Sequence, residues 1–112
     1  TGDGKAVVHI PIGLNGYELV EVHAEVNTAP AGSTIIVEVS KNGASTQMLS
    51  TNITIDASET GSDTAATAPV VQTNGNEDVG TNNTVQINVT QVGSSTAGSG
   101  LIVTMGFAQL TP

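Results

Sequence analysis

The sequence predicts an all-β domain, folded as an antiparallel sandwich or a small barrel. Short runs in which apolar and polar residues alternate recur at a spacing of about 8 to 12 residues, which is typical of such folds. Charged residues make up only 11% of the chain, while Thr and Val, which suit half-buried strands, are plentiful. An Asn-Gly pair between two of the runs indicates a hairpin. At 112 residues, the chain forms a single domain, 1–112.

Two strands are predicted ahead of the hairpin. In the segment 5–12, Pro11 restricts the strand to a sheet edge or a strand end, because proline has no N–H to donate. Its residues Val8, Ile10 and Ile12 share one face. The segment 17–27 is the most regular half-buried strand. One of its faces carries Val20, Val22, Ala24 and Val26, and the other carries Leu19, Glu21, His23 and Glu25.

The hairpin occupies residues 34–56. Its first arm alternates through Ile35, Val37 and Val39. Asn42-Gly43 then supplies two residues that tolerate a positive φ, as a two-residue type I′ turn requires. The second arm and a third short strand carry the apolar residues Met48, Leu49, Ile53 and Ile55.

The second half of the chain adds three more predicted strands. The segment 57–68 is a polar surface connection, 69–73 is a short strand, and 74–83 is a turn-rich loop. In 84–92 we expect Val85, Ile87 and Val89 to point inward and Gln86, Asn88 and Thr90 to point outward. A flexible loop, 93–100, leads to a last strand with the buried stripe Leu101, Val103, Met105 and Phe107. The total is about seven or eight short strands.

The charge of the chain excludes several classes of partner. The formal net charge is −8, and Lys5 and Lys41 are the only permanent cations. Two lysines cannot form the cationic patch that binds nucleic acid or an anionic membrane surface. No apolar run approaches the roughly 18 residues of a membrane-spanning helix. Cysteine is absent, so a disulfide framework and a thiolate metal site are also excluded.

Glu21, His23 and Glu25 are the first candidates for chemistry. Residues at i, i+2 and i+4 of a strand share a face, and a histidine between two carboxylates is suited to bind a divalent metal or to act as a general base. The sequence offers no identifiable fourth ligand, so we interpret the three residues as a solvated strand face.

Asn74, Asn76 and Asp78 have the alternating oxygen donors of a calcium loop. An EF-hand also needs Gly directly after the third donor and a Glu further on, whereas here Gly80 is displaced by one position and Val85 stands where the Glu is needed. We therefore interpret the segment as a turn-forming loop and expect no metal.

The sequence predicts no enzyme and no cofactor. A nucleophilic Ser or Thr needs a nearby base, and the two candidates, His9 and His23, both lie in predicted strands without a nucleophile elbow. The glycine-rich segment 93–100 is followed by a strand, not by the helix N-terminus that holds a phosphate.

An extracellular carbohydrate-binding module is an alternative interpretation. Sugar rings usually stack on an exposed aromatic side chain, and Tyr17 is the one residue available for this. Polar side chains in the loops could serve in its place, so the sequence leaves this function open.

The order of turns and strands resembles that of a known family of domains. Most of the chain takes part, and it is similar to the small jelly-roll β-sandwich domains of tailed-bacteriophage virion proteins. The similar residues are Leu14 to Leu19, Val37 to Gly43, Met48 to Ser50, Ile53 to Asp56 with Glu59, Thr64 to Ala66, Pro69 to Val71 and Gly100 to Val103.

The resemblance implies a fold of jelly-roll type and a location on the virion surface. It implies a non-enzymatic structural or host-attachment module of a tail fibre, a tail tip or a head decoration. The partners that it implies are further copies of the chain, in a homotrimer, other virion proteins, and a glycan or protein on the host surface. It assigns no functional residue.

Overall fold

The computed structural model describes residues 2–110 and confirms an all-β, antiparallel sandwich. Those residues form ten strands and two single turns of 3-10 helix, η1 and η2. Their bounds are β1 Gly2–His9, η1 Ile12–Leu14, β2 Tyr17–Glu25, β3 Ile35–Lys41, β4 Thr46–Gln47, β5 Leu49–Thr51, β6 Ile53–Ile55, η2 Ser62–Thr64, β7 Val70–Val71, β8 Asp78–Val79, β9 Thr84–Gln91 and β10 Ile102–Gln109.

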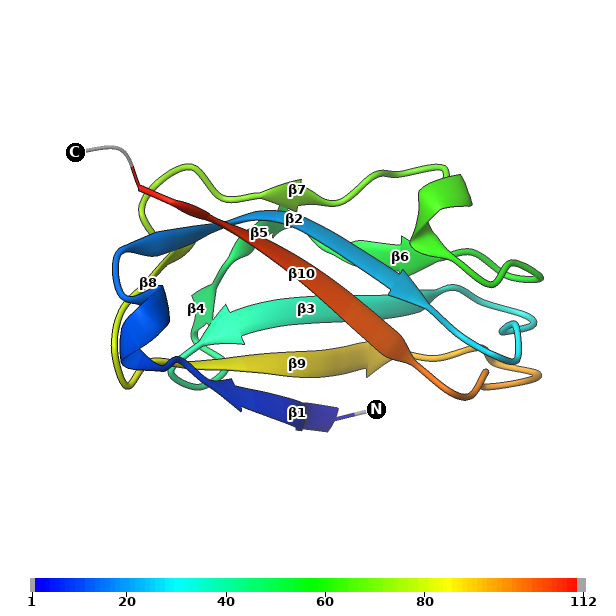
Figure 1. Cartoon of the computed structure of the whole chain (residues 1–112). Coiled ribbons are helices and arrows are strands. Elements are labelled where there is room, and N and C mark those ends of the chain that lie inside the picture. The colour runs from blue at the N-terminus through cyan, green and yellow to red at the C-terminus, as the bar shows by residue number, and fades with distance from the viewer. Residues whose placement is uncertain (1, 111–112) are drawn as a thin grey trace.

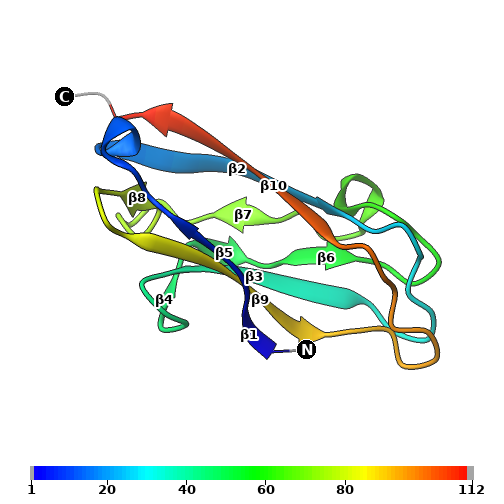
Figure 2. The same cartoon turned by 60° about the horizontal axis from the view of Figure 1, so that its bottom comes forward.

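The strands form two main layers (Figures 1 and 2). One sheet has the order β1-β9-β3-β4, with β6 also paired to β3, and the other has the order β10-β2-β8. The second strand of the chain thus pairs with the last one, and the third with the last but one, a nested wrapping that agrees with the jelly-roll type. β5 and β7 pair to form a short two-stranded ribbon, which lies at one side of the sandwich, between the planes of the two sheets (Figure 2).

The core lies between the layers and is made of aliphatic side chains. Ile53, Val37 and Val39 have no exposed surface, and neither do Met48 and Ile55. The inward residues of β10 are different, because they are only half-buried where they pack against this core. An edge strand has a neighbour on one side alone, so the expected buried stripe Leu101, Val103, Met105 and Phe107 is covered in part.

The hairpin differs from its prediction in two ways. Asn42 and Gly43 have positive φ values of 55° and 105°, as expected, but Lys41 pairs with Thr46, so the loop has four residues. The main chain and side chain of Asn42 bond to Thr84, which ties the loop to β9. The returning arm is longer than the part of β3 that it faces, and its middle segment, β5, leaves the sheet to pair with β7. This splitting adds one strand, and β8, inside the segment 74–83 that was expected to be a loop, adds another, so there are ten strands where about seven or eight were expected.

A β-bulge in β2 reverses the predicted face of its first residues. Leu19 pairs with Phe107 and Glu21 with Gly106, which leaves Val20 as an extra residue without a partner. Leu19 is consequently buried, with 1% of its surface exposed, and Val20 is 48% exposed. One extra residue shifts a period-2 pattern by one position, so the expected grouping of Val20 with Val22 and Ala24 was wrong.

Two other expected orientations were wrong. Of the three residues expected to share a face at the first strand, Ile10 is buried, but Val8 is 44% exposed and Ile12, in η1, is 82% exposed. Asn88, expected to point outward into solvent, is completely buried. The start of β1 covers Asn88, because the main-chain N–H of Gly4 donates a hydrogen bond to Asn88 Oδ1. This contact lies where the register between β1 and β9 is irregular.

Candidate functional site

The structure uses His23 as a packing and hydrogen-bonding residue. Past the bulge, Glu21 and Glu25 are exposed and His23 is half-buried. The buried Ser62 hydroxyl oxygen lies 2.9 Å from His23 Nδ1 and accepts a hydrogen bond from the main chain of Ala24 at 3.0 Å. Because Ser62 accepts from Ala24, its own hydrogen is free to point to the imidazole nitrogen. This contact holds η2 on β2.

Asn74, Asn76 and Asp78 do not converge. Asn74 Oδ1 accepts from the main-chain N–H of Asn76, while the Asn76 amide donates to the carbonyl of Gln47 on β4. Asp78 lies in β8, opposite Glu18 of β2. Asn74 thus serves the local turn, Asn76 ties that turn to β4, and Asp78 belongs to a different group.

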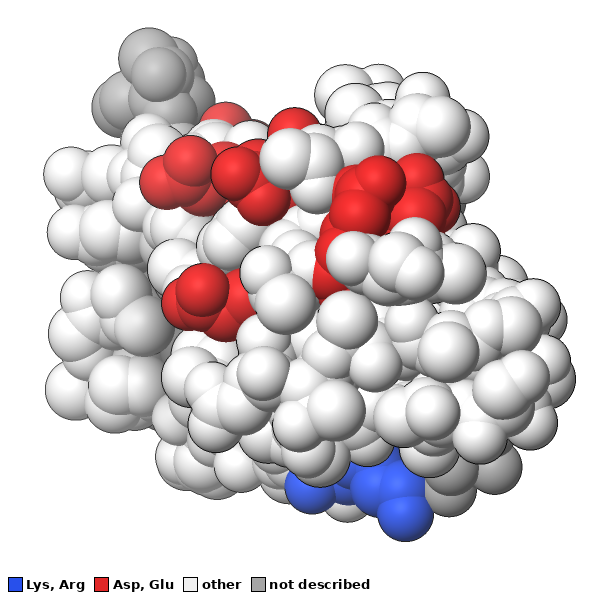
Figure 3. Space-filling model, turned by 90° about the vertical axis from the view of Figure 1, so that its right-hand side faces the viewer, with Lys and Arg blue, Asp and Glu red and all other residues white. Residues whose placement is uncertain are grey.

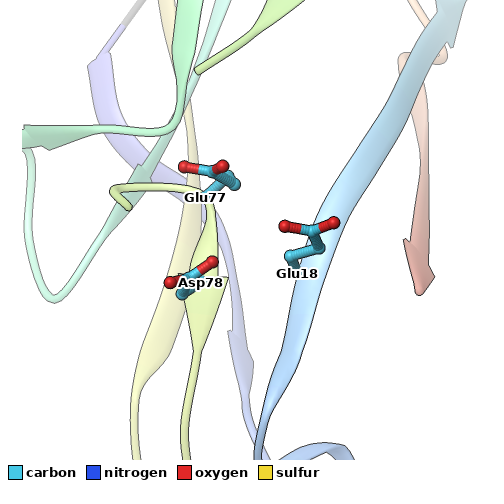
Figure 4. A group of neighbouring side chains, drawn as sticks. All are labelled: Glu18, Glu77 and Asp78. Carbon is cyan, nitrogen blue, oxygen red and sulfur yellow. The ribbon is translucent and has the colours of Figure 1, made fainter. Parts of the chain in front are cut away.

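That group is an acidic cluster of Glu18, Glu77 and Asp78 (Figure 4). One carboxylate oxygen from each residue lies within 4.8 Å of the others. Glu77 is only 8% exposed, and its Oε1 accepts a hydrogen bond from the main chain of Gly75. Lys41 donates to the main-chain carbonyl of Asp78. Carboxylate oxygens at such distances suit Ca²⁺ or Mg²⁺, so these three residues could hold a divalent cation.

Sequence analysis missed this cluster because its members are far apart in the chain. Glu18 joins Glu77 and Asp78 only through the pairing of β2 with β8. The available signal was the apolar Val79 directly after two acidic residues. Burial of Val79 in the core brings its neighbours Glu77 and Asp78 close to a strand.

A cavity adjoins the acidic cluster. It has a volume of about 470 Å³ and lies between β2 and the segment 69–73. Glu18, Glu21 and Glu77 line it together with apolar side chains that include Val22 and Val71. Its size and its carboxylates suit a small polar ligand.

The open side of the sandwich is the second notable surface. At that side a cavity of about 260 Å³ lies between Lys5 of β1 and the loop 97–101, and an adjoining cavity of about 280 Å³ lies between the edge strands β1 and β10. Lys5 and Leu101 line both cavities, and Val8, Val103 and Met105 line the second. We call this surface the β1–β10 cleft. Among the side chains that the structure describes, no carboxylate lines either cavity.

Charge is distributed unevenly over the molecule. On the face in Figure 3 the acidic side chains gather in the upper part, and the basic side chains lie at the lower edge. The β1–β10 cleft carries Lys5, whereas the cavity beside β7 carries three glutamates. The two surfaces therefore attract ligands or partners of opposite charge.

The histidines lie apart in the structure. His9 is exposed on β1 in one sheet, and His23 lies on β2 in the other.

Within residues 2–110, neither helical turn is long and apolar enough to cross a membrane. Comparison of the chain with protein families, with curated proteins and with solved structures finds no match.

Proposed function

We propose that this chain is a non-enzymatic structural module of a bacteriophage virion surface. In this role the sandwich assembles with neighbouring subunits on a phage head or tail, and its loops face outward for host attachment. The observation that carries the proposal is the β1–β10 cleft, where free strand edges flank apolar side chains. Exposed strand edges pair readily with other chains, so a protein that leaves one open has a surface suited to assembly.

The exposure of apolar side chains at this side supports the proposal. Val8 of β1 lines the second cavity and is 44% exposed, and Val103 and Met105 of β10, which line it too, are only half-buried. Apolar side chains gathered beside free edges are typical of subunit contacts. A net charge of −8 keeps the separate chains soluble before they assemble.

Carbohydrate binding is the second candidate, and one observation favours it. The cavity of about 470 Å³ beside β7 presents Glu18, Glu21 and Gln72, whose polar side chains suit the hydroxyl groups of a sugar. The loops of a virion module that attaches to a host could carry such a site, so this candidate and the first are compatible.

Immunogold electron microscopy tests the proposal. Antibodies raised against the folded domain are applied to phage particles from the cells that encode the chain, and antibody pre-absorbed with the domain serves as the control. The proposal expects specific gold labelling at the head or the tail. Particles that contain the phage's major capsid protein but never label would contradict it.

A glycan array and a panel of ester and glycoside substrates complete the test. For carbohydrate binding we expect retention of the wild-type domain on the array and loss of retention with the variant Glu21→Gln, because Glu21 is exposed and lines the cavity. Turnover of any substrate in the panel would overturn both candidates.

A further inference from the structure

We infer that two copies of this chain associate through β10, with the two β10 strands running antiparallel, side by side, about a two-fold axis. The inference rests on the proposed function and names one partner, a second copy of the chain, and the strand that binds it. Within residues 2–110, no strand pairs with the edge of β10 that faces away from β2, so the main-chain donors and acceptors of that edge are available.

The other edges of the sandwich are protected against pairing. β4, β7 and β8 have two residues each, and β5 and β6 have three, which is too short for a stable ladder. β1 is longer, but its register shifts between Gly2 and Ala6, and Gly2 and Gly4 have positive φ values. Such an irregularity twists an edge away from a partner strand.

β10 carries none of these protections. It has eight residues, Ile102–Gln109, with neither Pro nor any charged side chain. The bulge opposite it belongs to β2, at Val20, so β10 itself is continuous. A long, uncharged, regular edge is the type of strand that pairs with another chain.

The absence of charge along β10 suits a second copy as the occupant. Each copy has a net charge of −8, yet β10 has no charged side chain. In an isologous contact the two β10 strands therefore meet without like charges directly opposite each other, so an acidic chain can pair with itself there. Self-pairing of β10 would also cover the half-buried Val103 and Met105 with the same residues of the partner. Pairing of one strand with itself produces a two-fold, isologous contact.

Paired charge variants of Thr104 test the inference. Thr104 is exposed on β10, so Thr104→Glu and Thr104→Lys should fold normally, which circular dichroism checks. In an isologous contact each variant places two like charges near one another across the axis. We expect both to raise the dimer dissociation constant at least tenfold in sedimentation equilibrium at up to about 1 mM chain.

Thr90→Glu is the matched control, because Thr90 is an exposed strand residue on β9 in the other sheet. It changes the net charge as Thr104→Glu does, and we expect a change of less than about twofold. Raising the salt from about 10 mM to about 0.15 M should tighten the wild-type dimer, because it screens the repulsion between two acidic chains.

Single cysteines locate the axis, since the natural chain has no cysteine. Cysteines are placed one at a time along residues 102–108, and Thr90→Cys serves as the control. Oxidation should join two copies through cysteines at one point of β10, where opposite Cα atoms lie within the roughly 4.4 to 6.8 Å that a disulfide spans.

Four results would overturn the inference. A chain that stays monomeric to about 1 mM does not self-associate. An oligomer that the Thr104 variants leave unchanged uses another surface. If Thr104→Lys strengthens the association and Thr104→Glu weakens it, the contact joins two unlike surfaces. A trimer without β10 crosslinks indicates the same. In each case gold labelling of virions would still support the proposed function, so the two failures are distinguishable.

Discussion

Replacement of Asn88 by alanine should strongly destabilise the domain, although this asparagine lies on a strand face expected to meet solvent. Its side chain is completely buried and joins two sheet strands to the start of β1. Asn88 Nδ2 donates to the buried Ser40 hydroxyl at 2.9 Å, and Asn88 Oδ1 accepts from the main chain of Gly4 at 2.9 Å and from Gln86 Nε2 at 2.8 Å.

The magnitude follows from the groups that Asn88→Ala leaves without partners. Ser40, which has no exposed surface, loses its partner, and so does the partly buried N–H of Gly4. A buried polar group without a partner costs about 1–3 kcal/mol, so we expect a loss of about 2–4 kcal/mol in the free energy of unfolding. At about 2.1 cal/mol/K for each of 112 residues, the melting temperature should fall by about 8–17 °C.

Urea unfolding followed by far-ultraviolet circular dichroism measures this loss. Gln86→Ala is the matched control, because it removes one donor to Asn88 Oδ1 and leaves Gly4 in place, and it should cost less than about 1 kcal/mol. In the double variant with Ser40→Ala the orphaned hydroxyl is gone, so the two losses should fail to add by about 1–2 kcal/mol. A change of less than about 0.5 kcal/mol for Asn88→Ala would refute the reasoning.

Three further predictions concern packing, backbone space and charge. Ile53→Ala should lower the free energy of unfolding, measured in urea, by about 2–5 kcal/mol, because Ile53 is completely buried. The control Ile12→Ala, at an 82% exposed position, should change it by less than about 0.5 kcal/mol. Equal effects of the two substitutions would contradict the assigned core. Gly93→Ala should lower the free energy of unfolding, measured by thermal unfolding, by at least about 2 kcal/mol, because a Cβ there would overlap Thr96 O and lie 2.8 Å from the main-chain nitrogen of Ala31. The control Gly13→Ala has open space around it and should be nearly neutral. A Gly93→Ala variant as stable as the wild type would exclude the close approach of Gly93 to Thr96 and Ala31. Glu18→Gln should raise the melting temperature at low salt, because two like charges no more than 4.8 Å apart repel by at least about 0.9 kcal/mol in water. The gain should shrink as salt is added, and a salt-independent loss would show that Glu18 stabilises the fold.

Local sequence patterns predicted the strands well where apolar and polar residues alternate without interruption by a bulge. The alternation of Ile35, Val37 and Val39 placed β3 and its buried face correctly, since all three side chains are buried. The positive φ of Asn42 and Gly43 was likewise predictable, because few residues other than Asn and Gly adopt that conformation without strain.

Features set by distant strands were not predictable in this way. The extra residue Val20 becomes a bulge only because β10 pairs with β2 on both sides of it, and Asn88 is buried only because the start of β1 folds over it. The acidic cluster depends on the short pairing of β2 with β8, which brings Glu18 to Asp78 across a long stretch of sequence. Each depends on which distant segments pair, and a local pattern such as the apolar Val79 after two acidic residues does not identify the partner strand.

The candidate surface could be predicted in part. The uncharged, β-forming sequence of residues 101–110 identified a strand, but its position at the free edge of a sheet follows from the sheet order. Lys5 acquires its significance in the same way, because the pairing of β1 with β9 places it in the β1–β10 cleft, away from the glutamates beside β7.

Solution mass, measured by light scattering coupled to size exclusion, tests the central claim of assembly most directly. The chain has a mass of 11.2 kDa, and association through β10 predicts a species of twice that mass whose fraction rises with chain concentration and with salt. The variant Thr104→Glu should return the mass to that of one chain. A wild-type mass of 11.2 kDa at every concentration and salt would contradict the account.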